Sequence, residues 1–193
     1  KWVELQQLTA RTVLSTPECF AERPIYEEII AWCGDRGGKF ELRRRQAEIA
    51  LVNYYLEWLK IGGSADDERL RDLAQNLESE ARSYLEKTAS QPEYHIPFRR
   101  SLAHYYLQNG KPNEAIAELK AAMELLPQHP LYSDTDTADF NLEIGLILAN
   151  HKKYSAALKY LEPALDAYRR AGEAFEIHAL QAEALIDECR ERL

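Results

Sequence analysis

The chain has 193 residues, of which 46% are hydrophobic and 29% are charged, and its formal net charge is −8. This composition is typical of a folded globular protein and excludes a largely disordered chain. Acidic residues outnumber basic ones by four in each half, 1–95 and 96–193. We therefore expect no nucleic-acid partner, because phosphate backbones are bound by clustered Lys and Arg. No apolar run approaches the ~18 residues of a membrane-spanning helix, so we expect no membrane span.

Apolar residues recur at spacings of three and four along nearly the whole sequence, which is the pattern of amphipathic helices. The pattern predicts helices at 2–14, 24–33, 41–60, 67–89, 96–109, 112–125, 138–150, 154–169 and 173–191. Gly110 suits a C-terminal helix cap, and Pro97 suits the first turn of a helix. Pro163, inside a predicted helix, predicts a bend or a new helix after Glu162. Short connections between most of these helices predict antiparallel neighbours.

Two of the predicted hairpins share a pattern of small and large residues. In both, 12 positions separate a small residue of the first helix from an alanine of the second, and a large apolar residue and another alanine follow after four and three more. The small residues let the two helices approach closely, the leucine fills the groove between them, and the second alanine leaves room for the next hairpin. The residues are Ala103, Tyr106, Ala115, Leu119, Ala122 and Pro127 in the first hairpin, and Gly145, Leu148, Tyr154, Ala157, Leu161 and Ala164 in the second.

This pattern resembles the tetratricopeptide repeat (TPR) family, although Arg169 replaces the closing proline of the second unit, and Arg99 and Asn141 replace the aromatic residue expected early in each unit. The resemblance implies an all-α fold in which antiparallel helical hairpins stack into a right-handed TPR-like superhelix, or α-solenoid. We expect one helical-repeat domain over 1–193. Its parts are a non-repeat helical pair (1–40), a degenerate elongated hairpin (41–95), two TPR units (96–130 and 138–170) and a capping helix (171–193).

The resemblance also implies a binding face, because the first helix of each unit lines the concave side of the superhelix. Acidic side chains in the second unit, Asp139 and Glu143, would repel the C-terminal carboxylate that many family members grip, so an apolar or basic segment fits better. A solvated polar face is the competing interpretation of the polar stripe in the first unit. The candidate partner-binding residues are Arg100, His104, Gln108, Leu142, Leu146 and Asn150.

No motif in the sequence indicates catalysis. The five histidines do not stand at metal-ligand spacing, and there is no phosphate-binding loop or nucleophile elbow. We expect no enzyme activity, no metal and no cofactor. The basic run Arg43-Arg44-Arg45 is flanked by Glu41 and Glu48 and is interpreted as a solvated helix start rather than a phosphate site.

The number and spacing of the cysteines indicate the cellular compartment of the protein. Three cysteines without a CxxC pair predict free buried thiols in a reducing compartment, which favours the cytoplasm. The sequence starts with Lys1 rather than Met, which suggests a processed or trimmed chain. Two alternatives stay open for it, a cleaved export signal and a missing neighbouring domain.

The favoured function is a protein- or peptide-binding scaffold or adaptor that uses the concave face, with a protein or peptide as its partner. The alternative is a regulatory or sensor domain of a larger protein, which docks on a neighbouring domain or ligand. A self-assembly module is the third possibility. The apolar start of the sequence, residues 1–8, leaves the oligomeric state open between a monomer and a weak dimer.

Overall fold

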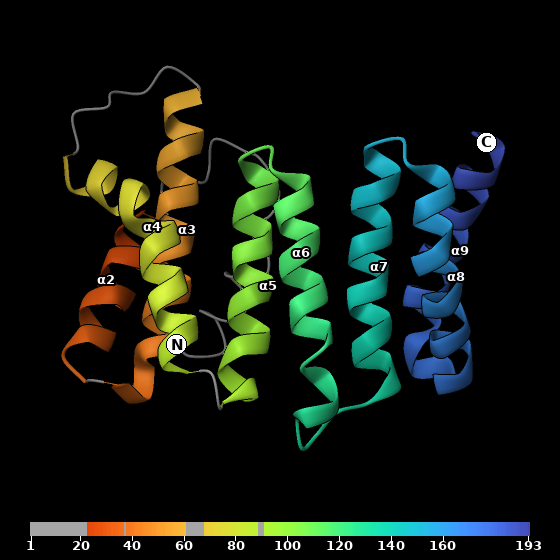
Figure 1. The fold of residues 1–193 in the computed structure, drawn as a ribbon, viewed down its shortest axis with the longest axis horizontal. Helices are drawn as coiled ribbons and strands as arrows, with labels where there is room; N and C mark the ends of the chain where they lie inside the picture. The colour runs from red at the N-terminus through yellow and green to blue at the C-terminus, as the bar shows by residue number, and fades with distance from the viewer. Residues whose placement is uncertain (1–22, 37, 61–67, 89–90) are drawn as a thin grey trace. The chain divides into compact units, whose positions relative to one another are not determined.

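The computed structural model describes residues 23–36, 38–60, 68–88 and 91–193. Over these residues the chain is all-helical, as predicted, with eight α-helices, three short 3-10 helices and no strand (Figure 1). The predicted helix 2–14 and Cys19 lie outside the described residues. The α-helices are α2 (Arg23–Gly34), α3 (Glu41–Lys60), α4 (Glu68–Lys87), α5 (Pro92–Gln108), α6 (Pro112–Met123), α7 (Asp134–Asn150), α8 (Tyr154–Ala171) and α9 (Glu176–Glu191). The 3-10 helices are η2 (Gly38–Phe40), η3 (Leu126–Gln128) and η4 (Glu173–Phe175).

The chain divides into two compact units, Lys1–Tyr84 (unit 1) and Leu85–Leu193 (unit 2), with the boundary in the last turn of α4. In unit 1, Tyr26 of α2, Leu51 and Tyr55 of α3, and Leu70 of α4 form a common buried cluster. This cluster ties α3 to α4 within the segment predicted as an elongated hairpin.

In unit 2 each α-helix packs on the next one along the chain, and neighbouring helices run antiparallel (Figure 1). One continuous apolar cluster extends from α5 to α9. The residues that carry the repeat pattern lie inside it: the alanines at 103, 115, 122, 157 and 164 and the leucines at 119 and 161 are essentially inaccessible to solvent.

Gly145 shows why a small residue is needed at the crossing of α7 and α8. A Cβ atom added there would lie 2.6 Å from the Cγ of Leu161 and 3.5 Å from the backbone oxygen of Ala157. Carbon atoms normally approach to about 3.5–4.0 Å, so any larger residue would have to displace Leu161. The predicted close approach of the two helices is therefore present.

The two hairpin turns have the same geometry. After α5, Gly110 has a φ of 69°, its N–H donates to the Leu107 oxygen at 3.0 Å, and the Lys111 N–H donates to the Tyr106 oxygen at 2.8 Å. This is the Schellman arrangement that ends a helix. After α7, Lys152 takes the equivalent place with a φ of 59°. The expected role of Gly110 is confirmed, and the second turn repeats it with a residue that tolerates the left-handed conformation less well.

The structure differs from the prediction most at the start of α5, at the start of α7 and at Pro163 in α8. α5 begins at Pro92, so Pro97 lies inside this helix rather than in its first turn. α7 begins at Asp134 instead of 138, because the Asp136 carboxylate accepts hydrogen bonds from the Ser133 N–H and hydroxyl, both at 2.7 Å, and stabilises an earlier start. α8 continues through Pro163, and no new helix begins after Glu162.

Candidate functional site

The face formed by α5 and α7 is held together by an ion pair between the two helices. The Nε of Arg100 on α5 donates to Oε1 of Glu143 on α7 at 2.7 Å, and a second guanidinium nitrogen contacts the same oxygen. The guanidinium also lies over the ring of Phe140, 5.5 Å from its centroid. Arg100 therefore links the first helices of the two predicted repeats, although its side chain is still half exposed.

His104 lies on the other side of the same carboxylate. Its Nε2 is 3.9 Å from Oε2 of Glu143, close enough for an ion pair when the imidazole is protonated. Burial of Glu143 opposes ionisation, but His104 and Arg100 outweigh it and hold the pKa of this carboxyl below its ordinary value. Glu143 is therefore a charged, partly buried group between two basic side chains.

A second acidic group, Asp139, lies one turn earlier on α7 and is held by α8. The buried Tyr168 hydroxyl donates to Oδ1 of Asp139 at 2.7 Å. Burial, together with this hydrogen bond, raises the pKa of Tyr168 far above its ordinary value, so the hydroxyl stays a donor. Both carboxylates that the sequence placed in the binding face thus have partners within unit 2.

The six predicted site residues differ in accessibility. Arg100 and Asn150 are exposed, while His104, Gln108 and Leu146 are half-buried. Leu142 is only 8% exposed and belongs to the core cluster of unit 2. Leu142 lies on the same side of α7 as the half-buried Leu146, but other helices pack on more than one side of α7. Leu142 therefore acts in packing and offers little surface to a partner.

The second helices of the two hairpins also lie together. The Lys120 ammonium of α6 is over the Tyr160 ring of α8, 5.4 Å from its centroid, and Lys153 donates to Oδ1 of Asn113 at 3.4 Å. Each pair joins residues 40 apart, close to the 43 that separate Arg100 from Glu143. Side chains of α5 thus contact α7, and side chains at α6 contact residues of α8 and of the turn before it.

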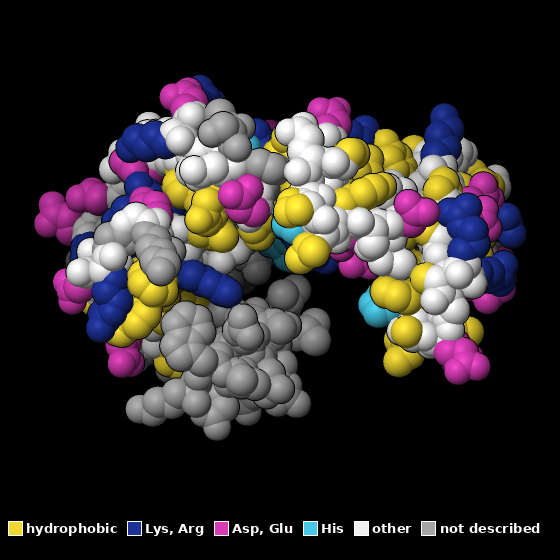
Figure 2. All heavy atoms as spheres, turned by 90° about the horizontal axis from the view of Figure 1, so that it is seen from below, with side chains coloured by type: hydrophobic (Ala, Val, Ile, Leu, Met, Phe, Trp, Pro, Cys, Tyr) yellow, Lys and Arg dark blue, Asp and Glu magenta, His cyan; other side chains and the backbone are white. Residues whose placement is uncertain are grey.

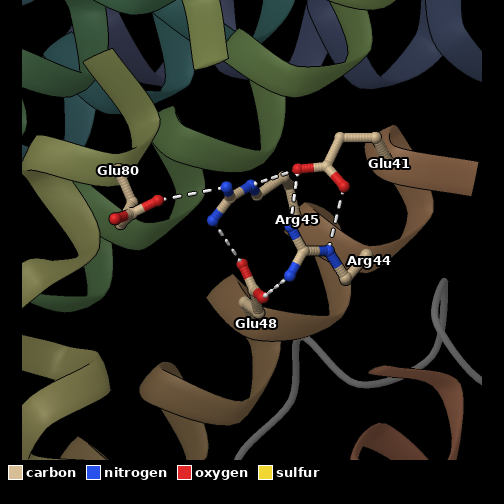
Figure 3. Close-up of polar contacts among 5 residues, drawn as sticks. All are labelled: Glu41, Arg44, Arg45, Glu48 and Glu80. Carbon is tan, nitrogen blue, oxygen red and sulfur yellow. Dashed lines mark hydrogen bonds and ion pairs between the residues drawn. The ribbon is translucent and has the colours of Figure 1, made fainter. Parts of the chain in front are cut away.

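In unit 1, the basic run at the start of α3 forms an ion-pair network (Figure 3). Arg44 binds Glu41 at 2.7 Å, and Arg45 binds both Glu48 and Glu80 at 3.0 Å. The hydrogen bond from Arg44 is the main reason why the pKa of Glu41 is lowered. The predicted helix start is present, because α3 begins at Glu41, but Arg44 and Arg45 are partly buried and paired with carboxylates rather than fully solvated. The signal in the sequence was the spacing of Glu41 and Glu48, three to four residues from the arginines.

The two described cysteines, Cys33 and Cys189, are free and buried, as predicted, and burial raises the pKa of both thiols. Among the described residues, no three His, Cys, Asp or Glu side chains gather in a way that could hold a metal ion. None of the described helices is both long and apolar enough to cross a membrane.

Sequence reasoning missed one surface feature, on α9. Ile177 is 79% exposed and Leu180 is 58% exposed on the helix that was expected to act as the cap of the domain. Hydrophobic side chains reach the surface between acidic and basic ones on the face of the molecule seen in Figure 2. The signal was present in the sequence, because Ile177, Leu180 and Ala184 follow a spacing of three and four residues that differs in phase from the buried residues of the same helix.

In comparisons with known proteins, no protein-family model, no curated protein and no solved structure matches this chain.

Proposed function

We propose that unit 2 is a protein- or peptide-binding scaffold, built from two TPR-like hairpins that begin a right-handed superhelix. The observation that carries this proposal is the pair of side-chain contacts between the hairpins, Arg100 of α5 with Glu143 of α7 and Lys120 of α6 with Tyr160 of α8. The close approach of Gly145 to Leu161 supports it, because this packing is what the repeat pattern requires. Stacked hairpins of this kind form extended surfaces that suit polypeptide ligands.

The partner lies on the face formed by α5 and α7 and carries an apolar or basic segment. Leu146 supplies apolar area, Asn150 and Gln108 supply polar contacts, and Asp139 and Glu143 make a neighbouring carboxylate unfavourable. Leu142 is left out of the contact surface because it is buried. The two buried thiols are consistent with a cytoplasmic location, where thiols stay reduced.

Selection from a random peptide library, with the full chain immobilised, tests this function. We expect the enriched peptides to be apolar or basic and to lose at least about tenfold in affinity, or about 1.4 kcal/mol, when Leu146→Lys and Asn150→Lys are combined. Both substitutions suit a helix surface, since lysine keeps its stem on apolar neighbours and its charge in water. Fluorescence anisotropy with labelled peptides measures the affinity.

A matched control adds the same charge elsewhere in unit 2. Ala117→Lys with Ser155→Lys introduces two lysines at exposed positions of α6 and α8, the second helices of the hairpins. This variant should bind the selected peptides as the parent chain does. If the Leu146 and Asn150 variant kept full affinity for every selected peptide, the α5–α7 face would be excluded as the binding face.

A further inference from the structure

The outer side of α9 carries a second surface, separate from the α5–α7 face. Ala182, Ile186 and Cys189 are buried and turn one side of the helix toward the core of unit 2. With about 100° of rotation per residue, Ile177, Leu180 and Ala184 fall on the opposite side, where all three are exposed. Single exposed leucines are common on protein surfaces, but three apolar residues on one side of a helix form a stripe.

The stripe continues into acidic residues at the same spacing. Asp187 and Glu191 follow Ala184 by three and seven residues and are exposed. The five positions 177, 180, 184, 187 and 191 therefore alternate in steps of three and four, which is the spacing of the contact seam between two packed helices. They span about 21 Å of helix. The first three are apolar and the last two are negatively charged.

Basic residues of α9 do not neutralise this end of the seam. Arg190 donates to Glu162 of α8 at 2.9 Å, away from the stripe, and Arg192 pairs with Glu188 on α9 itself at 3.1 Å. The carboxylates of Asp187 and Glu191 therefore set the charge of the C-terminal half of the seam. A partner must supply apolar side chains opposite one half and positive charge opposite the other.

We propose that the outer side of α9 is a docking surface for an amphipathic helix of another protein, with apolar residues at helical spacing followed or preceded by Lys or Arg. A helix fits because the seam is straight and has helix-to-helix spacing, and because no strand edge is present in the described residues. Apolar contact gives the affinity, and the two carboxylates select a basic partner.

A second copy of this chain fits the surface poorly. Two α9 helices in parallel would place Asp187 beside Asp187, and like charges in a contact destabilise it. In antiparallel orientation with full overlap, Glu191 would face Ile177 and Asp187 would face Leu180, which buries unpaired charge against apolar groups. An overlap limited to the three apolar positions would bury only about two turns of helix.

The test uses the full chain and synthetic helical peptides of about five turns. Two basic peptides carry leucine at three seam positions and lysine at the other two, and they differ in whether the lysines precede or follow the leucines. Each has an acidic analogue with glutamate in place of the lysines. We expect a basic peptide to bind at least tenfold more tightly than its acidic analogue, and more weakly in ~0.5 M salt than in dilute buffer. Fluorescence anisotropy reports binding.

Two variants on α9 and two control variants make the test specific. Ile177→Ser with Leu180→Ser should reduce binding of the basic peptide at least tenfold, while Leu131→Ser, at an 82% exposed leucine outside α9, should leave it unchanged. Asp187→Lys with Glu191→Lys should invert the preference toward the acidic peptide. The Leu146 and Asn150 variant should still bind the basic peptide, which separates this surface from the α5–α7 face.

Three results would overturn the proposal. The first is equal binding of the basic and acidic peptides, and the second is binding that survives substitution of both Ile177 and Leu180. The third is a concentration-dependent dimer in sedimentation equilibrium that the same double substitution removes, because the surface would then belong to a second copy of the chain.

Discussion

Gly145 is the position where a single methyl group gives the sharpest test of the packing in unit 2. Gly145→Ala adds a Cβ that would lie 2.6 Å from the Leu161 Cγ. To restore an ordinary carbon–carbon distance, Leu161 or the α7–α8 crossing must move by about 1 Å. Leu161 has no solvent access, and neither do Ala157 and Ala164 beside it, so the leucine cannot turn outward to relieve the contact.

Two effects of opposite sign decide the magnitude. Replacing glycine by alanine inside a helix stabilises by about 1 kcal/mol. Overpacking a close-packed core costs about 1–3 kcal/mol, and the closed surroundings of Leu161 favour the upper part of this range. We therefore expect Gly145→Ala to lower the free energy of unfolding of unit 2 by about 2 kcal/mol.

A double-mutant cycle isolates the contact. Leu161→Ala alone should cost about 2–5 kcal/mol because it leaves a cavity. In that background, Gly145→Ala no longer meets Leu161, so it should stabilise by about 1 kcal/mol. The effect of the same methyl group would thus change sign, with a coupling energy of about 3 kcal/mol. Ala117→Gly, at an exposed site of α6, measures the intrinsic helix preference as a control.

Equilibrium unfolding in guanidinium measures these values, followed by far-ultraviolet circular dichroism for the whole chain. The three tryptophans, at positions 2, 32 and 58, all belong to unit 1, so tryptophan fluorescence follows that unit separately. The opposite result is a rise of about 1 kcal/mol in the stability of the parent chain on Gly145→Ala, as at an ordinary helix position. That result would mean that the two helices do not approach closely at Gly145.

Four further outcomes follow from local geometry, each measured by denaturant unfolding. Lys152→Gly should stabilise by about 1 kcal/mol because it relieves the left-handed backbone at this turn, and no gain would contradict the positive φ. Tyr168→Phe should destabilise by about 1.5–3 kcal/mol through loss of the hydrogen bond to Asp139, whereas a neutral result would mean that this bond is absent. Asp136→Ala should cost about 0.5–2 kcal/mol by removing the cap of α7, and an unchanged midpoint would count against the capping interaction. His95 is buried, and burial is the main cause that lowers its pKa below the ordinary 6.5. Since the unfolded chain then binds the proton more readily, the free energy of unfolding should be highest above pH 6.5 and fall below it, by at most about 1.4 kcal/mol per pH unit. His95→Gln should remove this loss. A pH profile that stays the same in the variant would exclude His95 as its source.

Some features of the fold follow from local sequence alone. Spacings of three and four predict the helices because one side of each helix must leave water, and short turns make neighbours antiparallel. Gly145, with the leucine at 161, predicted a close helix crossing because only a small residue leaves space for a large one. Gly110 predicted a left-handed cap for a similar reason, since glycine has no Cβ to clash.

Helix boundaries were harder to predict where a capping side chain or tertiary packing decides them. The start of α7 depends on the contact between Ser133 and Asp136, and proline was tolerated inside α5 and α8 at positions 97 and 163. A proline removes only one backbone hydrogen bond, and tertiary packing compensates for this loss. From the sequence, Pro97 was expected in the first turn of its helix and Pro163 at a bend or break, because sequence rules contain no information about that packing.

The burial and the charge pairing of the candidate site residues depended on the tertiary structure. Periodicity assigns Leu142 and Leu146 to one side of a helix, but only the neighbouring helices decide that Leu142 is buried while Leu146 keeps part of its surface. The same holds for the pairing of Arg100 with Glu143, whose side chains are 43 residues apart in sequence. On α9, two sets of apolar residues follow helical spacing, and the contact with α7 and α8 determines which set is buried and which stays exposed to water. The sequence by itself thus determined the helices and the small residues at their crossing, since these depend on backbone geometry and nearby side chains. The tertiary structure decided which charges are paired and which apolar groups remain open to a partner, because both depend on atoms brought together from distant parts of the chain.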